Sequence, residues 1–231
     1  MRKIFFVGVA LAALMTILSS ESIVAADNTG FYIGVSGGYV IPQTMTISDP
    51  NNGTAYSNSI LENGFLVGIT AGWITPFTQR IMTLEMEYNY IFRTDFDNDK
   101  AVYLSGKGYG TQDGSIRINA LLLNLKARYP KGRFHPYAGF GLGYAYSQVG
   151  DLTEREYNGS VMDIVPGESG GAFCWQILTG LDFDITTNFS AGIGYKYFAT
   201  KPTIGSASTS GIYADIDYRT SIITLGLTFA F

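Results

Sequence analysis

Met82-Thr83-Leu84-Glu85-Met86-Glu87-Tyr88-Asn89-Tyr90 is the stretch of sequence that decides the fold. Every second residue is apolar, so one face reads Met, Leu, Met, Tyr and Tyr, and the residues between them are Thr, Glu, Glu and Asn. A period of two is the period of a β-strand, whereas a helix would mix both sets on each of its faces. The stretch therefore predicts a strand with one apolar and one polar face.

Segments with the same alternation recur after Gly30 and number eight in all. They lie at Phe31–Ile41, Gly64–Thr75, Ile81–Phe92, Ile118–Tyr129, Pro136–Ser147, Ala172–Asp184, Phe189–Ala199 and Tyr218–Phe231. Each reaches the roughly 9 to 11 residues that a tilted strand needs to cross a bilayer. An even number of such strands is typical of a bacterial transmembrane β-barrel.

The connections between these segments alternate between short and long. Three are tight turns rich in Pro, Thr, Gly and Asn, namely Pro76–Arg80, Pro130–His135 and Ile185–Asn188. Four are long and polar, namely Pro42–Asn63, Arg93–Arg117, Gln148–Gly171 and Thr200–Asp217. The pattern predicts an all-β protein, an eight-stranded antiparallel up-and-down transmembrane β-barrel with short periplasmic turns and four long extracellular loops.

The N-terminus has the three parts of an export signal. Met1–Lys3 carries two positive charges, Ile4–Leu18 is apolar, and Ser19–Ala26 is rich in small residues. The apolar run is shorter than the roughly 20 residues that a spanning helix needs, which argues against a membrane anchor. We expect a signal peptide at residues 1–26, cleaved after Ala26, and a barrel domain at 27–231.

The composition excludes several classes of protein. Only 15% of the residues are charged, against about 25% in ordinary soluble domains. Aromatic residues make up 14%, which is incompatible with disorder. A formal net charge of −4 argues against nucleic acid as a partner. The single cysteine, Cys174, cannot form an internal disulfide, and a single histidine, His135, excludes most zinc chemistry.

The side chains indicate which face of the predicted strands meets lipid. In the second segment Phe65, Val67, Ile69 and Trp73 share one face. The other face of the segments is small or polar, as in Gln176, Gly180, Asp182, Ser190, Gly192, Gly194 and Lys196. A soluble sandwich would bury the bulky face, so we place that face toward lipid and the small and polar face in a narrow, filled lumen.

Aromatic residues are predicted to gather near both ends of the strands, as in the interfacial girdles of membrane barrels. Toward the short turns we expect Trp73, Tyr129, Phe183, Phe189 and Phe231. Toward the long loops we expect Tyr88, Tyr90, Tyr144, Trp175, Tyr195 and Tyr197.

The last eight residues, Thr224-Leu225-Gly226-Leu227-Thr228-Phe229-Ala230-Phe231, resemble the C-terminal β-signal of outer-membrane proteins. Gly30-Phe31-Tyr32-Ile33-Gly34, the run His135–Tyr144 and the run Gly192–Phe198 are similar to the eight-stranded surface antigens that include the opacity proteins and the membrane domain of outer membrane protein A. The resemblance implies a monomeric barrel in the cell outer membrane. Its partners would be outer-membrane lipid, the barrel assembly machinery through the last strand, and host surface molecules.

Catalytic and metal-binding patterns are poorly matched, and we predict no catalytic, cofactor-binding or metal-binding residues. His135 is the only base for a serine nucleophile, and Tyr137 stands where a barrel-type lipid A deacylase would carry a serine; we expect His135 to be a solvated turn residue. Asp95-Phe96-Asp97-Asn98-Asp99 resembles the start of a calcium loop, but Lys100 and Gly106 stand where the loop needs glycine and glutamate. Gly106-Lys107 fails as a phosphate-binding loop.

Four charged residues, Glu85, Glu87, Lys126 and Arg128, point inward by parity from adjacent predicted strands. Unpaired charges there would be costly, so we expect a lumenal salt-bridge network that plugs the barrel. The alternative is a gated pathway through it. The leading functional hypothesis is accordingly a non-enzymatic, adhesin-like surface protein that displays its loops, and the alternatives are a small channel or transport-related barrel and, third, a lipid-modifying enzyme.

Overall fold

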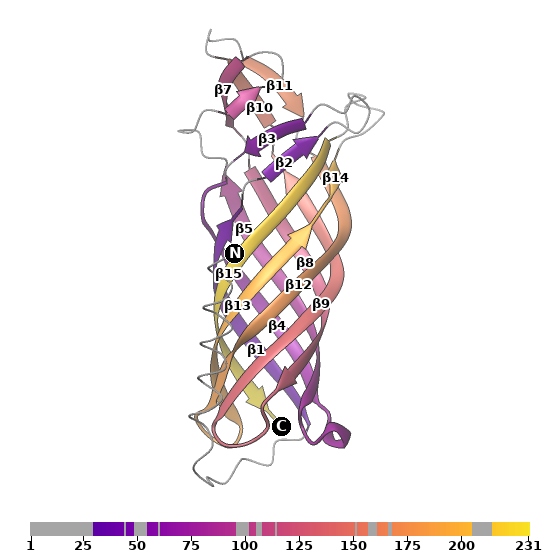
Figure 1. Cartoon of the computed structure of the whole chain (residues 1–231), viewed down its shortest axis with the longest axis vertical. Coiled ribbons are helices and arrows are strands. Elements are labelled where there is room, and N and C mark those ends of the chain that lie inside the picture. Colours follow the sequence, from indigo (N-terminus) through magenta and orange to yellow (C-terminus); the bar gives the residue numbers. More distant parts are fainter. Residues whose placement is uncertain are drawn as a thin grey trace, which may run out of the picture.

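The computed structural model describes residues 30–43, 45–48, 55–59, 61–95, 102–104, 108–113, 115–150, 152–156, 161–165, 168–204 and 214–231. The predicted signal peptide and its cleavage site lie outside these residues. Eight long strands form a closed barrel (Figure 1). They are β1 (Phe31–Pro42), β4 (Gly64–Ile74), β5 (Met82–Asp95), β8 (Ser115–Arg128), β9 (Phe134–Val149), β12 (Glu168–Asp184), β13 (Phe189–Thr200) and β15 (Ala214–Ala230).

Each barrel strand pairs antiparallel with the strands before and after it in the ring β1-β4-β5-β8-β9-β12-β13-β15. The first and last strands close the ring, with a register that runs from Tyr32 opposite Ala230 to Pro42 opposite Thr220. Closure leaves no unpaired barrel edge, which a sheet in lipid requires. The predicted eight-stranded antiparallel barrel is confirmed.

The three short turns lie at one end of the barrel, together with the C-terminus (Figure 1). The first contains a 3-10 turn, η1 (Pro76–Thr78), and the third spans residues 185–188 as predicted. The second was predicted two residues too long, because Phe134 and His135 already belong to β9 and pair with Phe183 and Asp182 of β12. Among the described residues no helix is long and apolar enough to cross a membrane.

The long connections carry short strands that the sequence did not predict. Beyond the barrel, β15 also pairs with β14 (Thr203–Ile204) and with β2 (Met45–Ser48), and β2 pairs with β3 (Ala55–Ser59). A separate four-stranded sheet contains β6 (Val102–Leu104), β7 (Gly108–Asp113), β10 (Leu152–Glu156) and β11 (Val161–Val165). All of these short strands lie at the end opposite the short turns (Figure 1).

Side chains on the barrel strands alternate in exposure, as the predicted lipid and lumen faces require. Phe65 is 64% exposed, its neighbour Leu66 is 2% exposed, and Ile69 is 62% exposed. On the outer face near the short turns, aromatic rings contact each other: Phe31 stacks on Trp73, and Phe189 meets Phe229 edge to face. The exposed apolar outer face has the composition that contact with hydrocarbon requires.

Candidate functional site

Glu87 is the centre of a hydrogen-bonded network in the lumen. Its side chain is 3% exposed, and its Oε2 accepts hydrogen bonds from Asn124 Nδ2 and Gln176 Nε2, each at 2.8 Å. Its Oε1 accepts a short hydrogen bond from Lys196 Nζ. The Gln176 amide also donates to Asn124 Oδ1 at 2.7 Å. A buried carboxylate with one cation and two amide donors is fully compensated, and so it can stay ionised inside the barrel.

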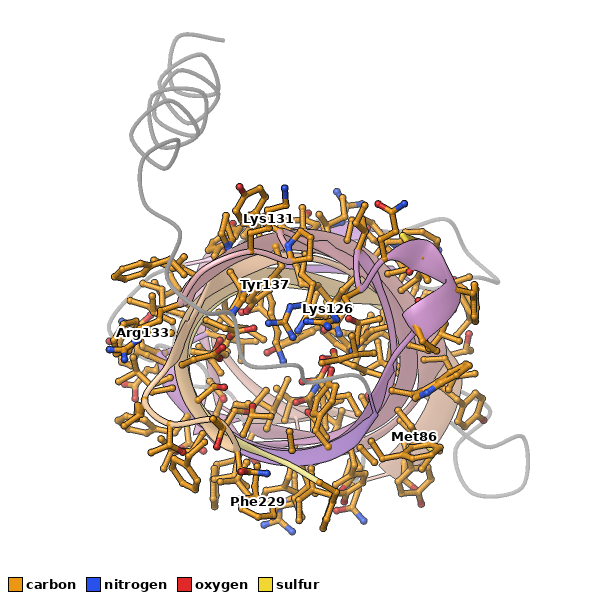
Figure 2. The ribbon with its side chains drawn as sticks, turned by 90° about the horizontal axis from the view of Figure 1, so that it is seen from below. Met86, Lys126, Lys131, Arg133, Tyr137 and Phe229 are labelled. Atoms are coloured by element: carbon orange, nitrogen blue, oxygen red, sulfur yellow. The ribbon has the colours of Figure 1, made fainter. Side chains whose placement is uncertain are left out.

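Glu85 forms a second ion pair one step along the same face of β5. Its Oε1 lies 2.8 Å from Lys126 Nζ on β8 and accepts a short hydrogen bond from the Tyr32 hydroxyl on β1. The Lys126 ammonium also lies 4.1 Å from the centre of the Tyr137 ring on β9, a cation–π distance. Lys126 and Tyr137 project into the lumen when the barrel is seen from the short-turn end (Figure 2).

The Glu87–Lys196 pair spans the lumen. β5 and β13 are separated by four steps in the ring of eight strands, so they lie on opposite walls. The pair therefore fixes the barrel across its diameter, whereas Glu85–Lys126 joins neighbouring strands. Together with the side chains that hydrogen-bond or contact them, the two pairs connect six of the eight barrel strands, which makes this half of the lumen a cross-linked plug.

The predicted lumenal network is confirmed for three of its four residues. Glu85, Glu87 and Lys126 are joined in ion pairs, but the guanidinium of Arg128 makes no ion pair within 4.0 Å in the described part of the chain, and its Nε has no hydrogen-bond partner. The second cation of the network is Lys196, which the prediction of the network did not include. The sequence placed Lys196 on the inward face, but its partner Glu87 lies on the opposite wall of the barrel. Periodicity carries no information about contacts across the lumen.

Glycine makes room for the polar side chains. A Cβ on Gly72 would lie 2.2 Å from the ring of Tyr32, and a Cβ on Gly141 would lie 2.0 Å from Asn124 Oδ1. The bare backbone at Gly72 thus lets Tyr32 cross β4 to reach Glu85. Lumenal glycines therefore set where long side chains from neighbouring strands can lie.

A cavity of about 110 Å³ lies in this polar half of the lumen. Arg128 and Asp182 line it, together with the hydroxyl-bearing residues Tyr32, Ser36, Thr70, Thr83, Ser190, Thr224 and Thr228. The Oγ1 of Thr83 and the Oγ of Ser36 are buried without a hydrogen-bond partner among the described atoms. Such a polar cavity has the volume and the donors to hold several waters.

His135 lies below the cavity, at the short-turn end, and is 3% exposed. The prediction of a solvated turn histidine was wrong, because β9 begins at Phe134, two residues earlier than predicted, and its parity turns the His135 ring inward. Its Nδ1 lies 2.8 Å from the carbonyl oxygen of Tyr129 and its Nε2 lies 2.8 Å from Asp184 Oδ2. The hydroxyl of Ser190 donates to the other oxygen of Asp184 at 2.7 Å. Both ring nitrogens are therefore held by oxygen atoms of neighbouring elements.

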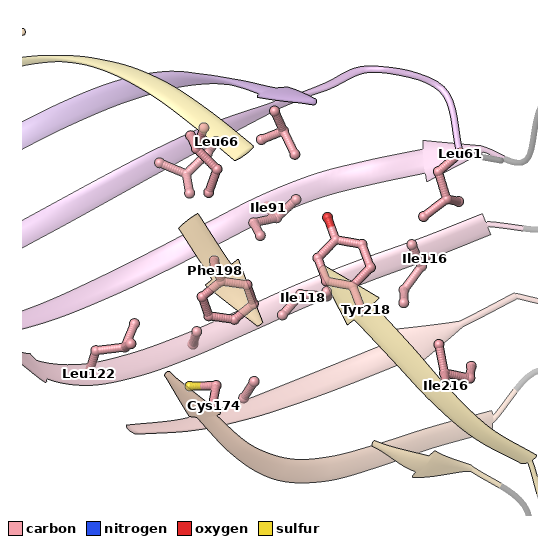
Figure 3. Packing of buried hydrophobic residues seen from close by; sticks show 14 of the residues in the cluster. Leu61, Leu66, Ile91, Ile116, Ile118, Leu122, Cys174, Phe198, Ile216 and Tyr218 are labelled. Atoms are coloured by element: carbon pink, nitrogen blue, oxygen red, sulfur yellow. The ribbon is translucent and has the colours of Figure 1, made fainter. Parts of the chain in front are cut away.

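The half of the lumen nearer the long connections is filled by apolar side chains (Figure 3). Phe198, Tyr218, Ile118 and Leu122 are each at most 1% exposed and face inward from three different strands. The cluster also contains Val40, Leu61, Leu66, Ile91, Ile116, Ala120, Ala145, Val149, Cys174, Ile216 and Ile222. The prediction of a small and polar inner face is therefore confirmed for the short-turn half. In the loop half it is incomplete, because large apolar side chains share the inner face with buried polar ones such as Asn89, Ser147 and Thr220.

Several residues considered from the sequence are not covered by the structure. In the calcium-like stretch only Asp95, the last residue of β5, is described, and Asp97 and Asp99 lie outside the described residues. The same holds for Gly106 and Lys107. Where the structure is described, no group of three or more His, Cys, Asp or Glu side chains is placed to hold a metal ion. The predicted absence of catalytic, cofactor and metal sites stays a prediction.

A closed barrel with an apolar outer face and a filled lumen defines a transmembrane β-barrel of the outer-membrane type. The family model described as "Outer membrane protein beta-barrel domain" matches residues 10–231. The chain belongs to this family, which implies a location in the outer membrane.

Solved structures show the same fold at low sequence identity. The outer membrane protein OprG from Pseudomonas aeruginosa has a TM-score of 0.56 and 15% identity, over 88% of this chain and 97% of that chain. Outer membrane protein AlkL, solved in lipid bilayers, has a TM-score of 0.51 and 17% identity, over 92% of this chain and 95% of that chain. A comparison with curated proteins found no match. At these identities the likeness shows the fold alone.

Proposed function

We propose that this protein is a non-enzymatic outer-membrane surface protein whose barrel anchors four long loops for binding to host or other surface molecules. The observation that carries the proposal is the contrast between a filled lumen and elaborate connections at one end. The lumen is closed by an ion-paired network and again by an apolar cluster. The described residues of the long connections form seven short strands, whereas an anchor alone could close each strand pair with about 2 to 5 residues.

The connection 148–171 is the best candidate for the binding surface. Its sequence contains Asp151, Glu154, Glu156, Asp163 and Glu168 against Arg155 as its single basic residue. Its strands β10 and β11 pair with each other, and β10 pairs with β7 of the connection 93–117. An acidic connection favours basic partners, with an attraction that salt screens beyond about 8 to 10 Å.

The surroundings of His135 support the non-enzymatic part of the proposal. The nucleophile of a hydrolase is activated by a base within hydrogen-bond reach, but both nitrogens of His135 are hydrogen-bonded to a carbonyl oxygen and a carboxylate. The neighbouring Ser190 donates its hydroxyl to Asp184. The arrangement joins the turn 129–133 to β9, β12 and β13, which is a structural role. A lipid-modifying activity lost in His135→Ala, with folding retained, would contradict this assignment.

A second candidate function is a small channel, and the polar cavity of the short-turn half favours it. The cavity would be the inner vestibule of a path that opens only when the apolar cluster moves. In the state described by the structure, Phe198 and Tyr218 fill the lumen beyond the cavity. The display function therefore agrees better with the arrangement of side chains.

The binding test compares bacteria that carry the wild-type protein with bacteria that carry a trimmed barrel. In the trimmed barrel an Asn-Gly turn replaces residues 150–167 and joins Val149 to Glu168, which are already opposite each other in the β9–β12 register. We expect host-cell binding to fall to the level of bacteria without the protein, at equal surface amounts. Binding at the wild-type level would refute the assignment of this loop. The same level after all four loops are trimmed would refute the display function.

The channel test measures the conductance of the purified protein in a planar bilayer. We expect no steady conductance from the wild type. Stepwise conductance that increases in Phe198→Ala, which shortens one of the two largest side chains of the cluster, would support the channel instead.

A further inference from the structure

The three short turns of the barrel carry charge of one sign. The three turns, residues 75–81, 129–133 and 185–188, contain Arg80, Lys131 and Arg133 and no acidic residue. Lys131 and Arg133 are exposed, and their side chains lie outside the barrel wall when the molecule is seen from this end (Figure 2). Next to the third turn, the Asp184 carboxylate at the end of β12 is hydrogen-bonded to His135 and Ser190. We call Arg80, Lys131 and Arg133 the basic collar.

The basic collar lies directly next to the apolar belt. Arg133 is followed by Phe134, which is 45% exposed and has its ring centre 4.9 Å from that of Phe183. In the first turn, Phe77 is 74% exposed and meets Trp73 edge to face at 5.8 Å. Girdles of aromatic residues flank the apolar band of membrane barrels at both lipid–water interfaces, and these exposed rings are placed to form such a girdle. The cations on the turns are therefore at the depth of the phosphates.

We infer that the basic collar binds the phosphate groups of anionic phospholipids in the leaflet at the short-turn end. Guanidinium and ammonium groups near a membrane surface attract anionic headgroups, and the flexible side chains extend from the apolar wall to reach them. The opposite end of the protein has the reverse sign, since the connection 148–171 has five acidic residues against one arginine. The charge of the molecule thus favours anionic lipid at one end only.

The two tryptophans make the inference testable, because each end has one. Trp73 lies beside the first short turn, and Trp175 lies on β12 toward the long connections, beside Tyr197. The full protein is folded into vesicles of phosphatidylcholine that contain an equal fraction of either brominated phosphatidylcholine or brominated phosphatidylglycerol. Bromine quenches nearby indole fluorescence, so Trp175→Phe reports lipid at the collar and Trp73→Phe reports lipid at the other end.

At low salt we expect phosphatidylglycerol to be enriched about threefold over phosphatidylcholine at Trp73 and not at Trp175. The enrichment at Trp73 should disappear in Arg80→Gln/Lys131→Gln/Arg133→Gln and at about 1 M salt, where the Debye length is about 3 Å. The matched control is Arg117→Gln/Lys201→Gln/Arg219→Gln. It removes the same charge from exposed residues at the other end and should leave the enrichment unchanged.

Three results would overturn the inference: equal quenching of Trp73 by the two lipids, enrichment that survives neutralisation of the collar, or enrichment that the control variant removes equally. Heat-modifiable mobility on gels checks that each variant is folded. If the collar variant does not fold, the comparison of the two lipids and the salt dependence in Trp175→Phe still decide the question.

Discussion

The two halves of the lumen are filled by opposite chemistry. The short-turn half contains the ion pairs Glu85–Lys126 and Glu87–Lys196, whereas the loop half contains an apolar cluster built around Phe198 and Tyr218. The polar half coincides with lumenal glycines on β13 and β15, among them Gly192, Gly194 and Gly226, which line its cavity. The comparison shows that one narrow barrel can be filled either by directional ion pairs or by apolar packing. Loss of a single side chain should therefore lower the free energy of unfolding for different reasons in the two halves.

The polar half should be the more sensitive to loss of a single partner. Glu87→Ala leaves the Lys196 ammonium and two amide donors without their acceptor in a buried site, so we expect the free energy of unfolding to fall by about 3 to 5 kcal/mol. Glu87→Ala/Lys196→Met removes the stranded charge and should recover a large part of that loss. Urea unfolding followed by tryptophan fluorescence measures both, and a double variant no more stable than Glu87→Ala would show that the pair is not coupled.

The apolar half is tested by two adjacent leucines on β8. Leu122 is fully buried in the cluster, whereas Leu123 is 68% exposed on the lipid face. Leu122→Ala loses transfer free energy and leaves a cavity, so we expect a cost of about 2 to 4 kcal/mol. Leu123→Ala loses only the transfer contribution, about 1 to 2 kcal/mol, because lipid or detergent fills the space. Equal unfolding midpoints for the two variants would mean that the loop half is not tightly packed.

Two cations in the polar half sharpen the comparison further. Lys126 is paired with Glu85 and lies over the Tyr137 ring, whereas Arg128 makes no ion pair among the described residues. We expect Lys126→Met to lower the free energy of unfolding by about 1 to 2 kcal/mol more than Arg128→Met, because only the former strands a buried carboxylate. A larger loss for Arg128→Met would show that Arg128, and not Lys126, holds this part of the network.

Much of the fold could be predicted because strand periodicity is local. Parity alone placed Glu85, Glu87, Lys126, Gln176 and Lys196 on the inner face, and all five are there. Parity does not show which side chains meet across the lumen, since that depends on the stagger of strands far apart in the sequence. This is why Lys196 was not recognised as the partner of Glu87.

The apolar half of the lumen was missed although the sequence held a signal for it. Ala120-Leu121-Leu122-Leu123 is apolar without alternation, and such a run indicates a strand whose two faces both meet apolar surroundings. The short strands of the connections have no comparable signal. Strands such as β14, which spans two residues, exist because β15 extends beyond the barrel and offers unpaired backbone groups at its edge.

The smallest expected effect on stability comes from trimming the connection 148–171. Both plugs lie below it: Val149, the last residue of β9, is already part of the apolar cluster and is kept when an Asn-Gly turn replaces residues 150–167. The β9–β12 ladder is also kept, because Val149 and Glu168 are its last pair and a two-residue turn can join them. The shorter connection closes with less loss of chain entropy, which offsets the loss of β10 and β11. We therefore expect the free energy of unfolding to change by less than about 1 kcal/mol, measured by urea titration beside Leu122→Ala as a reference for a broken plug. A loss as large as that of Leu122→Ala would mean that this connection helps to close the lumen. It would then be part of the filled barrel and not only a displayed loop.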